Sequence, residues 1–410
     1  MSTSRRQEIL ARARAAVDKA AAYGEDLDLS RFRVPVPEEK TALDPAELPA
    51  KDRERLLAAG IDLGGEDRSG TFLQVNHSVR CCGVAQEGLE VLSTFEALDK
   101  YPWVEDYWWR LVAPDQDKYT AQVALAEHRN GYFIRALPGS STVYPLQACL
   151  YLQEDGTVQN VHNIVIVEEG AELHLISGCA SAAQVKRGLH IGVSEFYVKK
   201  GGRLTFTMIH YWGEEVAVRP RSAAVVAEGG LFVSNYICLR PVRSLQMYPT
   251  AWLQGPEAVA RYYSILVAPP GTFMDVGSQV VLQAPQTRAE VVARTLTVGG
   301  EIINRGRLVA EAPEVKAHLE CRGLVLGERG VIHAIPELLT KVGNVDLSHE
   351  AAVGKIAQEE IEYLMARGLS EEEATATIVR GFLNVQITGL PDALQAEIDR
   401  AVAMGEKALF

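Results

Sequence analysis

Short units made of a glycine-containing turn and a strand recur between residues 115 and 345, and they constrain the fold more than any other feature. The turn glycines, each followed by alternating, β-branched or aromatic residues, are Gly170, Gly201, Gly202, Gly229, Gly230, Gly255, Gly299, Gly300 and Gly330. The units are about 30 residues apart, with one longer gap after Gly255. A unit of this size cannot bury its apolar face alone, so neighbouring units must stack; a sandwich would show less even spacing. The repetition therefore predicts a mainly β chain that folds as a parallel β-helix.

Helical patterns flank this β region on both sides. We expect residues 1–114 to be mostly helical, residues 115–349 to form the β-helix core, and residues 350–410 to form a second helical region. Capping boxes at Ser4 and at Ser370 predict the start of a helix in each flank, and Gly24 predicts the end of the first. Two more helical segments are expected, over residues 44–60 and from Asp392 onward.

Composition excludes several classes of protein. The chain has 41 Lys and Arg against 53 Asp and Glu, a net charge of −12, and no strongly basic window, so we expect no nucleic-acid partner. No stretch approaches ~18 consecutive apolar residues and the first ten residues lack an apolar export core, so we expect a cytoplasmic protein with no membrane partner. Six cysteines without a CxxC pair are too sparse for a disulfide scaffold, and we expect the adjacent Cys81 and Cys82 to be inert.

Common enzyme motifs are absent from the sequence. A phosphate loop at Gly354 is excluded because His349 stands where the first glycine of such a loop is needed. A zinc-protease motif at His349 and Glu350 is excluded because Val353 stands where the second histidine is needed. We therefore expect a protein that is not an enzyme by itself.

Alternation along the predicted strands places thiols and imidazoles on the inner side of the solenoid. Residues two apart share one face of a strand, so Cys179 lies on the same side as Leu173 and Leu175. The same rule gives an inward direction to His210, Cys321 and His349. Each of these side chains could be an ordinary packed core residue.

A more specific interpretation is a metal or sulfur site near the carboxyl end of the chain. Its residues would be Cys321, His349 and Glu350. Thiolate, imidazole and carboxylate ligands together suit iron or an iron–sulfur cluster. A mixed set of this kind should hold a cluster less tightly than four cysteines, which suits a protein that passes the cluster on.

Four segments carry a resemblance to a known family. They are SHEAAVGKI (residues 348–356), YLMARGLSEEEA (residues 363–374), ECRGLVLGERG around Cys321, and LHLISGCAS around Cys179. Together they resemble the SufB/SufD family of iron–sulfur cluster assembly scaffolds, over roughly residues 145–400. His190 and Trp212 also match the SufB pattern, whereas His210 stands where SufB usually has glutamine.

The resemblance implies a fold, partners and residue roles. It implies a right-handed parallel β-helix between helical regions, a dimer formed through the β-helices, and a SufC-like ATPase docked on the carboxyl-terminal helices. Cys179 would receive sulfur from a cysteine desulfurase, and Cys321 would hold the nascent cluster at the far end of an interior passage, with His349 and Glu350 beside it. The chain combines SufB-like and SufD-like features, which favours a homodimer over a SufB–SufD type heterodimer.

We therefore hypothesise a scaffold that assembles and transfers iron–sulfur clusters, with ATP hydrolysis in a partner subunit. One alternative is a SufD-like structural partner whose thiols take no part in sulfur transfer. The other is a β-helical carbohydrate-active enzyme, which would need a row of clustered Asp, Glu or Arg residues on one outer sheet face. No such row recurs in the sequence.

Overall fold

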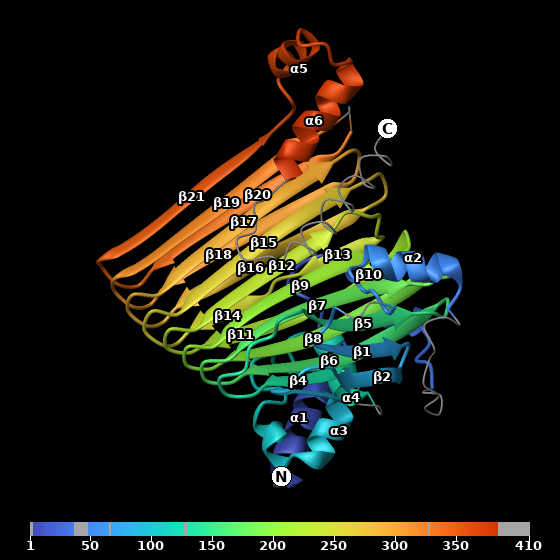
Figure 1. Ribbon diagram of the computed structural model, residues 1–410, viewed down its shortest axis with the longest axis vertical. Helices are drawn as coiled ribbons and strands as arrows, with labels where there is room; N and C mark the ends of the chain where they lie inside the picture. Colours follow the sequence, from blue (N-terminus) through green and yellow to red (C-terminus); the bar gives the residue numbers. More distant parts are fainter. Residues whose placement is uncertain (1–2, 37–47, 65–66, 127–129, 327–328, 384–410) are drawn as a thin grey trace.

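A computed structural model describes residues 3–36, 48–64, 67–126, 130–326 and 329–383 (Figure 1). Its centre is a β-solenoid of about eight turns with two long sheets. Sheet 1 contains, in spatial order, β2 (Ser78–Val84), β1 (Gly70–Val75), β5 (Leu146–Leu152), β7 (Glu172–Ser181), β9 (Arg203–Tyr211), β12 (Leu231–Cys238), β15 (Val259–Ala268), β17 (Arg288–Thr297), β19 (Val315–Val325) and β21 (Val345–Gly354).

Sheet 2 lies on the opposite side of the solenoid. Its ordered strands are β10 (Glu215–Val218), β13 (Ser244–Met247), β16 (Phe273–Leu282), β14 (Thr250–Leu253), β11 (Arg221–Val226), β8 (Arg187–Val198), β6 (Thr157–Val167), β4 (Tyr132–Ala136) and β3 (Leu89–Ser93). From β16 the sheet continues through β18 (Glu301–Ala310) to β20 (Val331–Thr340).

Parallel pairing between successive turns explains the sequence repeat. The strands of each turn pair with strands of the same sheet in the next turn, so that Ala293 of β17 lies beside Cys321 of β19. Only the pairs β1–β2 and β3–β4 are antiparallel among the described strands. The turn glycines serve this geometry directly, since Gly170, Gly201 and Gly229 all have positive φ, which side chains with a Cβ rarely adopt. The predicted parallel β-helix between helical terminal regions is confirmed.

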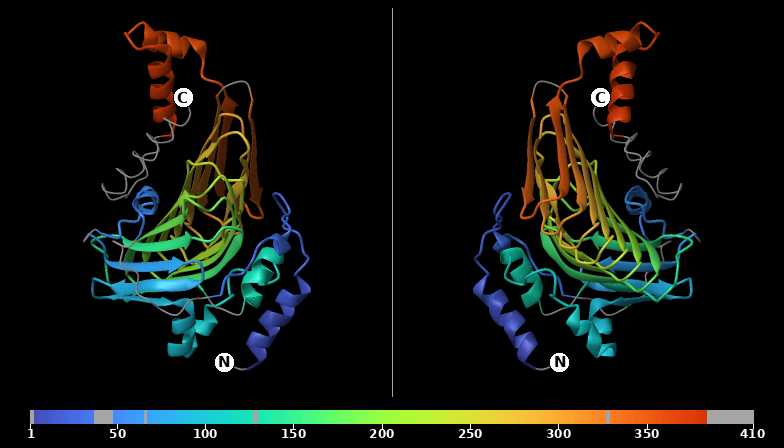
Figure 2. Two further views of the ribbon diagram at one scale, coloured as in Figure 1. Left: turned by 90° about the vertical axis from the view of Figure 1, so that its right-hand side faces the viewer. Right: turned by 90° about the vertical axis from the view of Figure 1, so that its left-hand side faces the viewer.

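The space between the sheets forms the main apolar core, because alternate residues of every strand point inward. A second apolar cluster covers the outer face of β6 and β8. It is built by α1 (Thr3–Ala15), α3 (Thr94–Lys100), α4 (Lys118–Leu125) and the short helices η1 (Leu29–Arg31) and η3 (Pro102–Asp106). Figure 2 shows α1, α3 and α4 gathered at the N-terminal end of the solenoid.

The amino-terminal region contains more strand than its pattern predicts. Strands β1, β2 and β3 all lie before residue 115, and β1 pairs with β5 in sheet 1. The edge of β5 offers hydrogen-bonding partners that the local sequence cannot reveal. Helix α1 ends at Ala15, before Gly24, and the Lys19 carbonyl beyond it accepts a hydrogen bond from the Lys118 backbone N–H at 2.7 Å. Helix α2 (Ala50–Ala58) falls within the expected segment 44–60.

The carboxyl-terminal helices α5 (Gln358–Met365) and α6 (Glu371–Leu383) extend beyond the last strands (Figures 1 and 2). The capping box that starts α6 is present, because the Glu373 backbone N–H donates to Ser370 Oγ at 3.2 Å and the Ser370 N–H donates to the Glu373 carboxylate at 2.8 Å. The helix expected from Asp392 lies outside the described residues. No helix in the described part of the chain is long and apolar enough to span a membrane.

Candidate functional site

Cys179 lies on the inner face of β7 and is fully buried. Its neighbour in register on β9 is His210, and the neighbour of His210 on β12 is Cys238. Paired residues of parallel strands point to the same side of a sheet, so these three side chains form one row facing the interior. Burial raises the pKa of Cys179 to about 12 and that of Cys238 also to about 12. Both thiols are therefore protonated at neutral pH.

Two histidines lie in the same part of the interior. The Tyr236 hydroxyl is 2.8 Å from His210 Nδ1. Burial lowers the pKa of His210 well below its usual value and raises that of Tyr236, so we assign a neutral imidazole that accepts the phenolic proton at Nδ1. His210 Nε2 then carries the hydrogen, and it has no partner in the structure. Burial also lowers the pKa of His190 to about 3, so both rings are uncharged.

A second inner row leads from this region to Cys321. It passes from Tyr236 of β12 through Ser264 of β15 and Ala293 of β17 to Cys321 of β19. Ser264 points inward yet keeps partly accessible surface, because a cavity of about 30 Å³ lies between the sheets beside Tyr236, Ser264 and Ser278. The row between the cavity and Cys321 is thus made of small side chains.

Cys321 lies on the inner face of β19 and is 1 % exposed. Burial raises its pKa to about 11, with a further rise from the nearby Glu320 carboxylate. The Arg294 guanidinium and a hydrogen bond from the Asn304 side chain of β18 act in the opposite direction and lower the pKa of Cys321. Cys321 is five strand spacings from Cys179 in sheet 1, roughly 24 Å along the solenoid.

His349 and Glu350 lie on opposite faces of β21. His349 pairs with the buried Leu319 of β19, so it shares the inner face with Cys321 as a diagonal neighbour whose Cα is roughly 8 Å away. Unlike Cys321, it is exposed, because β21 is the last strand of its sheet. Glu350 points to the outer face, where its carboxylate is 2.9 Å from the Arg322 guanidinium.

The structure therefore places Cys321 and His349 on the same face of neighbouring strands and Glu350 on the opposite face within one chain. Among the described residues there is no group of three His, Cys, Asp or Glu side chains arranged to hold a metal ion. One thiol and one imidazole can supply two ligands to iron, and a complete coordination shell needs ligands from outside this pair. The sequence pattern did not point to Asn304, Tyr236 and Cys238, which an alignment of the repeats by strand register would have placed beside the predicted residues.

The raised thiol pKa values predict how stability depends on pH. The pKa values of Cys179, Cys238 and Cys321, and of the buried Cys149, are all raised by burial. A raised folded-state pKa means that stability is fully present below the unfolded thiol pKa near 9 and is lost as the pH rises towards the folded values. Urea unfolding should therefore show the free energy of unfolding falling by about 2–3 kcal/mol from pH 8.5 to pH 9.5. A Cys149→Ala/Cys238→Ala variant should show about half of that fall, and an equal fall would contradict the assignment to thiols.

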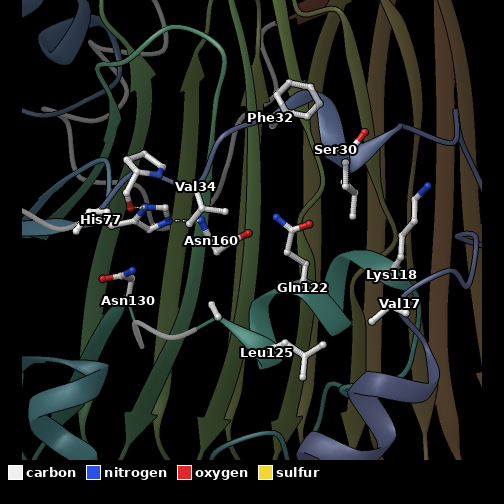
Figure 3. Close-up of a pocket in the computed structure, with 14 residues that line it drawn as sticks. Val17, Ser30, Phe32, Val34, His77, Lys118, Gln122, Leu125, Asn130 and Asn160 are labelled. Carbon is white, nitrogen blue, oxygen red and sulfur yellow. Dashed lines mark hydrogen bonds between the residues drawn. The ribbon is translucent and has the colours of Figure 1, made fainter.

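A cavity of about 620 Å³ lies apart from these residues, on the outer face of sheet 2 (Figure 3). His77 forms part of its wall, with Nδ1 3.1 Å from the Pro35 carbonyl and Nε2 accepting the Asn160 backbone N–H at 3.1 Å. These two bonds hold the chain around Pro35 against β6. None of the thiols or imidazoles of the interior lines this cavity.

The fold and its interior define a class of protein, a parallel β-solenoid with buried thiols and helical regions at both ends. Residues 150–382 match a family model described as the SUF system FeS cluster assembly, SufBD core domain. The chain belongs to the SufB/SufD family of iron–sulfur cluster assembly proteins.

Individual relatives cover most of the chain. An iron–sulfur cluster assembly SufBD family protein of Archaeoglobus fulgidus is 52 % identical over 359 residues, which are 88 % of this chain and 96 % of the relative. One from Methanothermobacter thermautotrophicus is 46 % identical over 408 residues, 98 % of this chain and 100 % of the relative. The iron–sulfur cluster assembly protein SufB of Bacillus subtilis is 30 % identical over 301 residues, 72 % of this chain and 64 % of that protein.

Proposed function

We propose that this protein is a cytoplasmic scaffold that receives sulfur at Cys179 and builds an iron–sulfur cluster at Cys321 and His349. The observation that carries the proposal is the inner row of small side chains, Ser264 and Ala293, which connects the cavity beside Tyr236 with Cys321. Polar inward-facing groups are costly in a solenoid core, so their presence here needs a reason beyond packing. Family membership supports the cluster assembly role over the carbohydrate-active alternative.

The open end of the solenoid supports a dimer of two copies. Strands β20 and β21 each have a hydrogen-bonded neighbour on one side only within the described chain. Unpaired edges that also carry apolar side chains favour association with another strand. Val331, Ile335 and Val353 are 44 %, 43 % and 44 % exposed there. A second copy at this end would lie beside His349, where it could complete the ligand set, including through a Glu350 released from Arg322.

The carboxyl-terminal helices are the proposed docking surface for a SufC-like ATPase. Helices α5 and α6 extend beyond the last strands (Figure 2), with Val379 and Leu383 of α6 buried in the main apolar cluster, and α5 exposes Tyr363 and Met365. ATP binding in the partner would then act on the solenoid through the short connection after β21. The protein itself would supply no hydrolytic chemistry.

A specific observation keeps the SufD-like role as a second candidate. Within one chain Glu350 is engaged with Arg322, so the cluster site has two ligand groups instead of three. A structural partner subunit would need no cluster ligands at all. Sulfur trapping separates the two roles, because only the scaffold has thiols that carry sulfur.

The test of the proposal is transfer of labelled sulfur from a cysteine desulfurase, followed by mass spectrometry of the cysteine peptides. In the wild-type protein we expect persulfide on Cys179 and later on Cys321. Cys179→Ser should remove both signals, and Cys321→Ser should leave the Cys179 signal in place. A Cys321 signal of normal size in Cys179→Ser would overturn the proposed route.

The interior row makes a separate prediction. In Ala293→Leu the larger side chain should fill the row between Ser264 and Cys321 and lower sulfur arrival at Cys321 by about tenfold or more, with labelling of Cys179 unchanged. Ala293→Ser, which keeps the row open, is the matched control. Equal labelling of Cys321 in the two variants would show that sulfur does not use this row.

A further inference from the structure

A pocket of about 410 Å³ opens at the carboxyl ends of β7 and β9. Its wall includes Arg55 of α2, Lys186 before β8, and Arg240 after β12. Trp212, the residue after β9, forms the side of the pocket nearest the interior. None of the residues assigned to sulfur or cluster chemistry above lines it.

The pocket concentrates positive charge in a chain whose net charge is −12. The guanidinium groups of Arg55 and Arg240 each lie 5.2 Å from the centre of the Tyr211 ring. Arg55 also donates to the Ser181 carbonyl at 2.8 Å. Within the described part of the chain, neither arginine nor Lys186 makes an ion pair with a carboxylate.

Two acidic residues, Glu214 and Glu215, also line the pocket. Glu215 is already engaged by Arg243, which lies outside the pocket, at 3.5 Å. Three cations therefore face one other carboxylate, that of Glu214, which makes no ion pair with any described residue. This balance suits an anionic ligand, and stacking on Tyr211 holds the two guanidinium groups in place.

Trp212 connects the pocket with the interior thiols. It is 2 % exposed, and its indole N–H has no hydrogen-bond partner among the residues that the structure describes. Its ring centre is 5.0 Å from that of His190 and 5.6 Å from that of His210. His210 is the register neighbour of Cys179. A buried donor without a partner costs free energy, and a ligand that accepts its hydrogen bond would remove that cost.

We propose that this pocket binds the sulfur donor to Cys179, as a persulfide that carries a carboxylate nearby. The inference rests on the proposed sulfur-receiving role of Cys179. The three cations would hold the carboxylate and the persulfide, and the indole N–H of Trp212 would donate to one of them. The volume is adequate for a group of the size of cysteine persulfide. The persulfide is shared by the free amino acid, which brings its own carboxylate, and by a persulfidated cysteine at the tip of a desulfurase loop, where a neighbouring acidic side chain would supply the carboxylate.

The transfer step is balanced without an added oxidant or reductant. The Cys179 sulfur attacks the terminal sulfur of R–S–SH, a new S–S bond forms on Cys179, and the S–S bond of the donor breaks. The leaving sulfur takes the proton that the Cys179 thiol loses, so the products are a Cys179 persulfide and R–SH. Because burial raises the thiol pKa, a donor concentrated at the pocket compensates for the small thiolate fraction.

The test measures the initial rate of Cys179 persulfidation against the concentration of free cysteine persulfide, by mass spectrometry. In the Arg55→Gln/Lys186→Gln/Arg240→Gln variant we expect the half-saturating concentration to rise about tenfold with an unchanged maximal rate. Added KCl should raise it in the wild-type protein and have little effect in the variant. Arg203→Gln, an exposed arginine at the opposite end of β9, is the matched control and should behave as wild type.

Smaller changes guard against misfolding of the triple variant. Lys186→Glu alters an exposed side chain and should raise the half-saturating concentration about threefold, and Arg240→Lys should restore most of the affinity lost in Arg240→Gln. Repeating the titration with a persulfidated desulfurase distinguishes the two sources. If the triple variant raises the half-saturating concentration of the desulfurase alone, the pocket binds the protein donor. If it also raises the half-saturating concentration of free cysteine persulfide, the pocket binds the small molecule as well. Unchanged half-saturation in both arms overturns the pocket, whereas absence of any persulfide on Cys179 in the wild-type protein overturns the proposed function instead.

Discussion

Anaerobic reconstitution of the Cys321→Ala variant with iron and sulfide is expected to give less than about a tenth of the visible cluster absorbance of the wild-type protein. Cys321 and His349 are the proposed ligand groups, and they lie on the same face of the neighbouring strands β19 and β21 at the open end of the solenoid. Removing the thiolate leaves one imidazole, and a single imidazole holds iron too weakly to retain a cluster. Bound iron and acid-labile sulfide measured after desalting provide the second readout.

Cys238→Ala is the matched control for this result. Cys238 is also buried and also lies on the inner face of sheet 1, so the two substitutions remove the same volume from similar surroundings. The control should retain cluster absorbance close to that of the wild-type protein. Full cluster absorbance in Cys321→Ala, or equal losses of absorbance in both variants, would contradict the assignment of Cys321 as a cluster ligand.

The Ile335→Glu/Val353→Glu variant is expected to be a monomer at concentrations where the wild-type protein is a dimer. These residues lie on the unpaired strands β20 and β21, and burying each apolar side chain contributes about 1.5–3 kcal/mol. Replacing them with carboxylates that would be buried weakens association by about 100-fold or more. Sedimentation velocity over a concentration series measures the change.

Val84→Glu provides the comparison for the interface. Val84 is 50 % exposed on β2, the edge strand at the other end of sheet 1. It should leave the oligomeric state unchanged. If Val84→Glu dissociated the dimer while the carboxyl-end variant stayed dimeric, the interface would lie at the β2 end of the solenoid, and the proposed interface at β20 and β21 would be wrong. The carboxyl-end variant should also lose cluster absorbance if the second copy supplies ligands.

Much of the fold could be predicted because the solenoid repeats a local pattern. Turn glycines such as Gly201 and Gly229 recur with the strands, and each strand alternates apolar residues on its inner face. The strands β1 to β3 were not predicted, because their pairing partners, such as β5, are distant in sequence. Edge pairing of this kind is a long-range hydrogen-bonding effect that short-range periodicity does not reveal.

In the candidate site, too, local alternation could be predicted from the sequence, whereas contacts between strands distant in sequence could not. Alternation correctly predicted that Cys179, Cys321 and His210 face inward. The likeness to the family grouped Glu350 with Cys321, but adjacent residues of a strand point to opposite faces, and Glu350 pairs with Arg322 on the outside. The Asn304 contact with the Cys321 sulfur comes from the opposite sheet and has no signal in the local sequence.

The amino-acid sequence by itself determined the repeat length, the inward direction of the thiols and the family, since each depends on the order of residues along one strand or one motif. Only the tertiary structure decided which rows those thiols join, that Ser264 and Ala293 separate Tyr236 from Cys321, and that three cations gather beside Trp212. The physical reason is register. Neighbours across a parallel sheet are set by hydrogen bonds between turns, and their spacing in sequence varies with every loop.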